Sequence, residues 1–259
     1  MPAFSANLSM LFNEAEFQNR FLLAAEAGFK GVEYLFPYAW PAEELKQLLD
    51  TNGLTQVLFN LPPGDWDAGE RGIACLPDRV EEFQAGVDKA IHYARILGCS
   101  QLNCLAGLCP SNLDEAEAWN TLVANVEYAA EKLGQAGITL CLEAVNSRVD
   151  MPGFFLDTSS RVIQVIEAVD ADNVKLQYDI YHMQIMEGDL IRTMECLLPW
   201  IAHIQIADNP GRHEPGTGEI HFPRVFEALD RMGYKGWVGA EYRPSGTTTD
   251  SLEWFRARA

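Results

Sequence analysis

The sequence predicts a (β/α)₈ barrel, also called a TIM barrel, formed by a single domain over residues 1–259. Eight short apolar segments alternate with eight segments of helical pattern along the chain. Strands that alternate with helices pair in parallel through crossovers, so eight such units predict a closed barrel, and the length fits this class. An open doubly wound sheet is the alternative. The eight nearly equal units and the lack of a glycine-rich first turn favour the barrel.

Glycine and proline mark several of the element boundaries. Gly28 ends the first predicted helix, and the second begins with Pro41 and ends before Gly53, the usual placement of these residue types. In chain order, the predicted strands are 4–10, 31–36, 55–61, 101–107, 139–146, 174–179, 202–207 and 236–242. The predicted helices are 14–28, 41–52, 80–97, 114–135, 159–169, 188–198, 224–232 and 248–256.

The composition limits the partners of the chain. Nineteen Lys and Arg against 37 Asp and Glu give a net charge of −18. Nucleic acids and anionic membranes bind basic patches, so we expect neither as a partner, and an anionic small molecule would need local cations. No apolar run is long enough to span a membrane, the N-terminus does not resemble a signal peptide, and the six cysteines form no CxxC pair. These features predict a soluble, cytoplasmic protein with reduced thiols, and leave open whether it is a homo-oligomer.

Each of the last four predicted strands carries an oxygen-bearing side chain near its C-terminal end. These residues are Glu143, Asp179, Gln205 and Glu241. Strand side chains alternate between two faces, and in all four strands the aliphatic neighbours fall on the opposite face. The aliphatic face suits contact with the helices, so the polar face is expected to line the barrel at the end where active sites of this fold lie.

This set of four residues predicts a metal site. Three carboxylates placed together repel one another and raise each other's pKa values, and a divalent cation removes that penalty. Three carboxylates and an amide oxygen form an all-oxygen ligand set that suits Mg²⁺, with Mn²⁺ as the alternative, better than zinc. A separately hydrogen-bonded polar group is the simpler interpretation of any one of them. Four on matching faces favour the metal.

Two further residues are candidates for contact with a substrate. His182 follows Asp179 by three residues, just beyond the strand end, although a lone histidine is more often structural. Arg212 lies in the loop 208–223, which is rich in glycine and proline, and its guanidinium could bind a carboxylate through two hydrogen bonds. A solvated loop charge is an equally weighted interpretation of Arg212.

The loop 62–79 is the other long connection in the chain. Its length and its Gly, Pro and Asp content are typical of a functional or disordered loop, and Trp66 indicates that part of it packs. We expect this loop to close over a substrate, with Trp66 excluding water. Glu70 and Arg71 are candidate substrate contacts, and, as for Arg212, a solvated loop charge is the other interpretation of each.

Several long motifs resemble the hydroxypyruvate isomerase family of the xylose-isomerase-like barrels. They are ANLSMLF, NLPPGDWDAGERGIACLP, QYDIYHM, QIADNPGRHEPGTGEI and GWVGAEYRP, and the resemblance covers essentially the whole chain. By position, Glu143 and Glu241 match the paired catalytic glutamates of the family. Glu143, Asp179, Gln205 and Glu241 match its metal ligands, and His182 and Arg212 match its substrate contacts. The tagatose epimerases of the wider family usually have His where this chain has Gln205, which leaves the identity of the metal open.

The resemblance implies a proton-transfer isomerase acting on a small carboxylate. Hydroxypyruvate and tartronate semialdehyde differ in which of two adjacent carbons carries a proton, and an enediolate connects them. The alternatives are an isomerase of the four-carbon 2-oxo-tetronate or a related sugar-acid or ketose isomerase or epimerase. A more distant alternative is a phosphodiesterase like endonuclease IV, which needs a His-rich multi-metal cluster and basic grooves, whereas this acidic chain has five histidines. A non-catalytic sensor of small acids is a further alternative. It would be expected to lack one of the two glutamates, and this chain has both.

Overall fold

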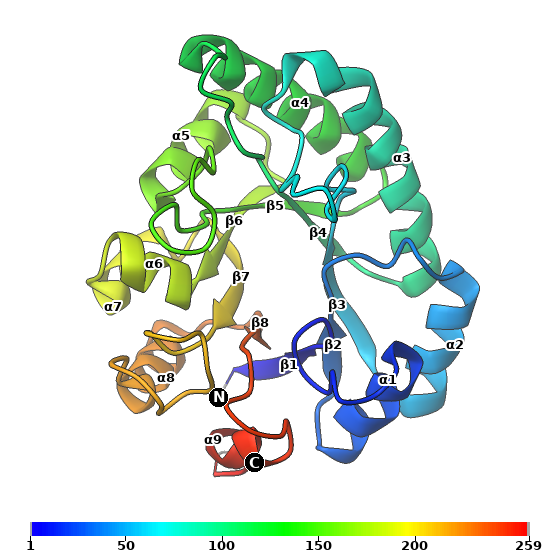
Figure 1. Ribbon diagram of the computed structural model, residues 1–259, viewed down its shortest axis with the longest axis vertical. Coiled ribbons are helices and arrows are strands. Elements are labelled where there is room, and N and C mark those ends of the chain that lie inside the picture. The colour runs from blue at the N-terminus through cyan, green and yellow to red at the C-terminus, as the bar shows by residue number, and fades with distance from the viewer. Residues whose placement is uncertain (1, 258–259) are drawn as a thin grey trace.

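Eight parallel strands form a closed barrel in the order β1 to β8, as the sequence predicts (Figure 1). The computed structural model describes residues 2–257. The strands are β1 (Ala3–Asn7), β2 (Gly31–Glu33), β3 (Thr55–Asn60), β4 (Gln101–Cys104), β5 (Thr139–Glu143), β6 (Val174–Asp179), β7 (Ile201–Ile206) and β8 (Trp237–Ala240).

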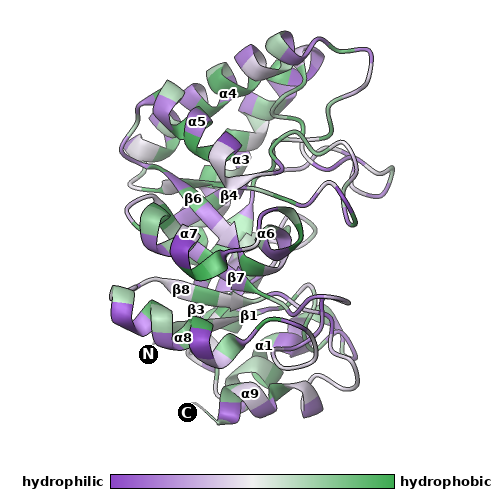
Figure 2. Cartoon of the chain, turned by 90° about the vertical axis from the view of Figure 1, so that its left-hand side faces the viewer, coloured by the Kyte–Doolittle hydropathy of each residue, from purple (hydrophilic) through white to green (hydrophobic). Residues whose placement is uncertain are grey.

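Helices surround the barrel and carry both hydrophobic and hydrophilic residues, as expected for elements with one face toward the strands (Figure 2). They are α1 (Phe17–Glu26), α2 (Ala42–Asn52), α3 (Val80–Leu97), α4 (Glu115–Gln135), α5 (Ser159–Val169), α6 (Ile180–Met186), α7 (Leu190–Leu197), α8 (Phe222–Met232) and α9 (Glu253–Arg256), with short 3₁₀ helices η1 (Pro77–Arg79) and η2 (Asp250–Leu252). Within residues 2–257, no helix has the length and hydropathy to cross a bilayer.

The structure corrects several predicted boundaries. It adds α6 directly after β6, because the Asp179 carboxylate accepts hydrogen bonds from the backbone N–H groups of Tyr181 and His182 and so caps a helix where the sequence analysis placed none. The helix predicted at 224–232 begins two residues earlier, with Pro223 in its first turn. The closing helix begins at Glu253 rather than at 248, because Thr248 bonds to Phe12 and Glu14 across the chain.

Strand register brings the polar residues of the last four strands together. Glu143 lies beside Gln177, and Asp179 lies beside Gln205, which in turn lies beside Gly239. The aliphatic residues of the same strands face the helices and are fully buried. They are Leu140, Leu142, Leu176, Ile204, Ile206, Val238 and Ala240. The alternation that the sequence showed therefore persists in the fold, with a polar interior toward the C-terminal ends of the strands.

Candidate active site

A cavity of about 420 Å³ lies at the C-terminal ends of the strands. The residues that form it come from β1, β3, β5, β6 and β7, from α6, and from the segments that follow the strands, including Glu241 directly after β8. Of the residues singled out in the sequence, the cavity lining includes Trp66, Arg71, Glu143, His182, Gln205, Arg212 and Glu241. The structure thus gathers at one cavity side chains that are far apart in the chain, which is the arrangement expected of a binding site.

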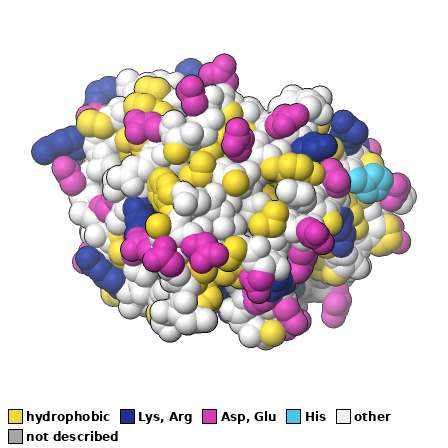
Figure 3. All heavy atoms as spheres, turned by 90° about the horizontal axis from the view of Figure 1, so that it is seen from above, with side chains coloured by type: hydrophobic (Ala, Val, Ile, Leu, Met, Phe, Trp, Pro, Cys, Tyr) yellow, Lys and Arg dark blue, Asp and Glu magenta, His cyan; other side chains and the backbone are white. Residues whose placement is uncertain are grey.

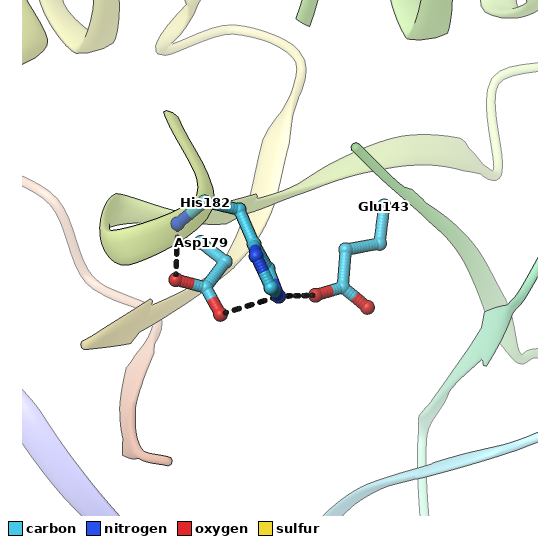
Figure 4. A group of neighbouring side chains, drawn as sticks. All are labelled: Glu143, Asp179 and His182. Atoms are coloured by element: carbon cyan, nitrogen blue, oxygen red, sulfur yellow. Dashed lines mark hydrogen bonds and ion pairs between the residues drawn. The ribbon is translucent and has the colours of Figure 1, made fainter. Parts of the chain in front are cut away.

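Glu143, Asp179 and His182 form a buried group at this cavity (Figure 4). The His182 ring lies between the two carboxylates, with its Nε2 atom 3.6 Å from Asp179 Oδ2 and 4.0 Å from Glu143 Oε1. One ligand atom from each residue lies within 4.8 Å of the others, so the group has the spacing that a metal ion requires. Asp179 Oδ2 is buried and has no hydrogen-bond partner among the described residues. A carboxylate oxygen left in that state is costly, and a divalent cation would satisfy it.

Arg212 is the buried one of the three arginines that line the cavity among the described residues. It is only 6% exposed, and its Nη2 atom lies 3.0 Å from Glu241 Oε1 and 3.8 Å from Asp179 Oδ2. Its Nη1 atom lies 3.9 Å from Asp150 Oδ1. The interpretation of Arg212 as a solvated loop charge is therefore wrong. The guanidinium is buried among carboxylates at the cavity wall, where little water screens its charge.

Burial controls the protonation of the site. It raises the pKa of Glu143 to about 8, with a further contribution from the charge of Asp179. Burial also raises the pKa of Glu241 well above its usual value, although Arg212 opposes that rise, and it raises the pKa of Asp179. The pKa of His182 lies well below its usual value because of burial and the nearby Arg212. Without a bound metal ion, the fold therefore shifts the three carboxyl groups toward their protonated forms and His182 toward its neutral form.

Gln205 is held by buried neighbours. Its Oε1 atom accepts a hydrogen bond of 2.6 Å from Gln177, and its Nε2 atom donates one of 2.9 Å to Glu33. Glu33 is fully buried and also accepts a hydrogen bond of 2.7 Å from Ser5. His203 Nε2 lies 2.9 Å from the same oxygen, Glu33 Oε2. The ligand role of Gln205 stays a prediction, because its oxygen is already bonded to Gln177.

Comparison with known proteins identifies the family. The model of the xylose isomerase-like TIM barrels matches residues 21–258. The chain belongs to this family. It is 51% identical to hydroxypyruvate isomerase of Escherichia coli K12 over 98% of both chains, and 46% identical to 2-oxo-tetronate isomerase of Cupriavidus necator over 99% of this chain and 98% of that one. A crystal structure named AP endonuclease, family 2, from Brucella melitensis is 47% identical, has a TM-score of 0.97 and covers 99% of each chain.

The loop 62–79 differs from the prediction in one respect. Arg71 lines the cavity, with its guanidinium carbon 4.2 Å from the centre of the Trp66 ring, and Trp66 packs edge-on against Phe36. Glu70 is not among the cavity-lining residues. Its carboxylate lies 2.6 Å from Arg79, so the structure gives it a role in holding the loop rather than the substrate contact that we expected. In the sequence Glu70 stands directly before Arg71, and nothing there indicated that its partner is Arg79.

Several polar residues of the site in this xylose isomerase-like barrel were not predicted from the sequence. Asn103 donates a hydrogen bond of 2.9 Å to Glu143. Asn146 contacts the His182 ring, and Asp150 lies beside the Arg212 guanidinium. Glu33 lies beneath Gln205. Glu33 had a signal, because it is a charged residue in the middle of an apolar strand, whereas the asparagines follow apolar runs in positions typical of any loop.

Proposed function

We propose that this chain is an isomerase that interconverts hydroxypyruvate and tartronate semialdehyde (2-hydroxy-3-oxopropanoate). One observation carries the proposal: two buried glutamates, Glu143 and Glu241, line the same cavity as the buried cation Arg212. Two carboxyl groups with raised pKa values suit transfer of a proton from one carbon and to another. The identity of 51% to a hydroxypyruvate isomerase over 98% of the chain supports the choice of reaction.

Different residues of the cavity bind the substrate carboxylate and cover the bound acid. Arg212 is the group that offsets the substrate carboxylate, because its fork of N–H donors matches two carboxylate oxygens. Such a cation is needed in a chain with a net charge of −18. Trp66 and Arg71, from the loop 62–79, line the cavity and would cover the bound acid. Closure of this loop would remove water from the reacting carbons.

The two glutamates then move the proton. One takes a proton from C3 of hydroxypyruvate, which leaves an enediolate across the C2 and C3 oxygens. The other returns a proton to C2, while the C3 oxygen loses its hydroxyl proton and the C2 oxygen gains one. The C3–H bond is broken and the C2–H bond is formed, so the product is tartronate semialdehyde with no net change in oxidation state.

A divalent cation completes the site in this proposal. We propose Mg²⁺, with Mn²⁺ as the alternative, held by Glu143, Asp179, Gln205 and Glu241. When bound, such an ion stabilises negative charge on neighbouring substrate oxygens as a Lewis acid. The unpartnered Asp179 Oδ2 and the raised carboxyl pKa values support a cation here. Metal analysis of purified protein before and after chelation, with recovery of activity on Mg²⁺, tests this, and two or three zinc ions per chain would contradict it.

The decisive assay follows solvent hydrogen. In D₂O, wild-type protein is expected to place deuterium on the carbon that receives the proton, as seen by NMR of the product. The Glu143→Gln and Glu241→Gln variants are expected to lose both turnover and exchange. Turnover that carries the original hydrogen across without any exchange would favour a hydride shift and leave the glutamates only as ligands.

An isomerase of 2-oxo-tetronate is the second candidate. The cavity of about 420 Å³ has room for a fourth carbon, and relatives of that name are 43–46% identical. We expect the larger kcat/KM with hydroxypyruvate when the two acids are assayed side by side. A preference of about tenfold for the four-carbon acid, about 1.4 kcal/mol in the transition state, would change the substrate and leave the mechanism intact.

The name of the Brucella structure raises a nuclease as a third candidate. Its support is weaker, because Lys and Arg are scattered among Asp and Glu on the face seen in Figure 3 rather than gathered into a basic patch. Among residues 2–257, a single group has the spacing of a metal site. Incubation with duplex DNA that contains an abasic site is expected to leave it intact. Cleavage that disappears in the Glu143→Gln variant would overturn the isomerase proposal.

A further inference from the structure

Asn146 is a fully buried amide that follows β5 at the edge of the active site. Its Oδ1 atom accepts hydrogen bonds from the backbone N–H groups of Val149, at 3.0 Å, and Asp150, at 2.9 Å. A backbone N–H can only donate, so these contacts identify the oxygen of the amide. A flipped amide would place NH₂ against two donors, and the orientation of Asn146 is therefore fixed by its own loop.

The other end of the amide then has two hydrogens to donate. Asn146 Nδ2 lies 2.6 Å from Asp150 Oδ2 and 2.6 Å from His182 Nδ1. One hydrogen goes to the carboxylate. The second points to His182 Nδ1, which must carry a lone pair to accept it, because an amide nitrogen has none to offer. His182 is thereby the tautomer with its proton on Nε2.

We propose that Asn146 is a positioning residue that fixes His182 as the Nε2–H tautomer, so that His182 offers the cavity a hydrogen-bond donor and not a metal ligand. The Nε2 atom is the one that faces the site, 3.6 Å from Asp179 Oδ2 and 4.0 Å from Glu143 Oε1. A metal binds the lone pair of an imidazole nitrogen, and a protonated Nε2 has none. The group Glu143, Asp179 and His182 thus separates into two oxygen ligands and one donor for a substrate oxygen.

Asp150 connects this tautomer to the substrate-binding cation. Its Oδ2 atom accepts hydrogen bonds from Asn146 and from the Tyr181 hydroxyl, the latter at 2.9 Å, while its Oδ1 atom lies 3.9 Å from Arg212 Nη1. A single carboxylate therefore holds both the amide that sets His182 and the guanidinium beside it. The hydrogen bond that one nitrogen of an imidazole makes sets which of its two nitrogens carries the proton.

Nitrogen NMR tests the tautomer directly. The full chain, labelled with ¹⁵N in its five histidines, is observed through long-range proton–nitrogen correlations, and a His182→Gln variant assigns the signals. We expect the Nε2 signal of His182 in the protonated range and the Nδ1 signal in the unprotonated range, and both to stay there when Mg²⁺ is added. A proton on Nδ1, an imidazolium, or a shift of Nε2 to the metal-bound range on addition of Mg²⁺ would overturn the proposal.

The variant Asn146→Asp replaces the amide donor with a carboxyl group of nearly the same shape. The oxygen in place of Asn146 Nδ2 lies beside Asp150 Oδ2, so the two carboxyl groups are expected to share one proton, and this oxygen accepts a hydrogen bond from His182 Nδ1. The His182 proton is therefore expected to move to Nδ1. Loss of one well-placed donor costs about 10²–10³-fold in kcat, and we expect a fall of this size with Mg²⁺ binding retained. Asn173→Asp, which also removes amide bonds to backbone carbonyls but lies outside the cavity lining, is the control. It is expected to lower thermal stability without moving the His182 signals or kcat.

The kinetic part of this test rests on the proposed function, and the spectroscopic part does not. A wild-type protein with His182 as the Nε2–H tautomer but no turnover of hydroxypyruvate would contradict the proposed substrate and leave the role of Asn146 intact. An active enzyme whose His182 keeps the Nε2 proton in the Asn146→Asp variant would contradict the role of Asn146 alone. If that variant does not fold, the wild-type spectra with and without Mg²⁺ still decide.

Discussion

Replacing Gly239 with alanine tests how tightly the barrel interior is packed around Glu33. A Cβ atom at Gly239 would lie 2.3 Å from Glu33 Oε1 and 2.5 Å from Oε2. Glu33 is fully buried between Ser5, Gln205 and His203, so its carboxylate cannot retreat without losing a partner. Burial alone would raise the pKa of Glu33, but His203 and the hydrogen bonds from Gln205 and Ser5 lower it overall, so the carboxylate is charged.

The cost has two parts. Overpacking of a filled core costs about 1–3 kcal/mol, and loss of one hydrogen bond to a charged group costs about 1.5–3 kcal/mol. We therefore expect Gly239→Ala to lower the free energy of unfolding by about 2.5–6 kcal/mol. For a chain of this size each kcal/mol corresponds to about 2–4 °C, so the Tm should fall by roughly 5–24 °C. Thermal unfolding followed by circular dichroism, in metal-free buffer, measures it.

A second substitution, at Glu33, distinguishes a clash with the Glu33 carboxylate from a general loss of stability in β8. Glu33→Asp withdraws the carboxylate by one methylene, so the double variant should be more stable than the sum of the single changes predicts. Gly246→Ala is the matched control, because a Cβ there meets nothing within 4 Å, and it should change stability by less than about 0.5 kcal/mol. A Gly239→Ala protein as stable as this control, or single effects that simply add, would refute the reasoning.

Three further predictions concern the site. Glu143→Gln and Glu241→Gln should each lower kcat by about 10²–10⁴-fold with an unchanged circular dichroism spectrum, and a loss below tenfold would contradict their proton-transfer roles. Trp66→Ala should speed limited proteolysis of the long loop that contains it, and wild-type cleavage that a substrate analogue does not slow would contradict closure. Asp208 accepts four backbone N–H bonds in the loop that carries Arg212. Asp208→Asn should cost about 3 kcal/mol and raise KM more than it lowers kcat; an unchanged KM would contradict this.

Sequence periodicity was sufficient to predict the barrel and the position of its site. Alternation in β5 to β8 placed the four oxygen-bearing residues on the interior face, and the parallel fold placed them at one end. Both inferences need only the geometry of a strand and the rule that sites of this fold lie at the C-terminal ends. Register then set which residues became neighbours, such as Asp179 beside Gln205.

Contacts made by loops and by the ends of side chains could not be predicted from periodicity. The burial of Arg212 depends on the path of the loop after β7, and the hydrogen bond from Asn146 to His182 depends on the turn after β5. Neither path is encoded in a period of two or of 3.6 residues. The same applies to the pairing of Glu70 with Arg79, which only the folded loop brings together.

The three-residue spacing between Asp179, at the end of β6, and His182 indicates the site better than either residue alone, and the contacts of Asp179 give the reason. Its Oδ1 atom accepts hydrogen bonds from the backbone N–H groups of Tyr181, at 2.8 Å, and His182, at 3.3 Å, and so caps α6. The cap fixes the rotation of the carboxylate, which leaves Oδ2 without a hydrogen-bond partner among residues 2–257 and 3.8 Å from Arg212 Nη2. It also starts the helix whose first turn carries His182 back toward that free oxygen, at 3.6 Å. One oxygen of this carboxylate thus shapes the backbone, while the other faces His182 and Arg212, and the cap brings the residue three positions later beside that second oxygen.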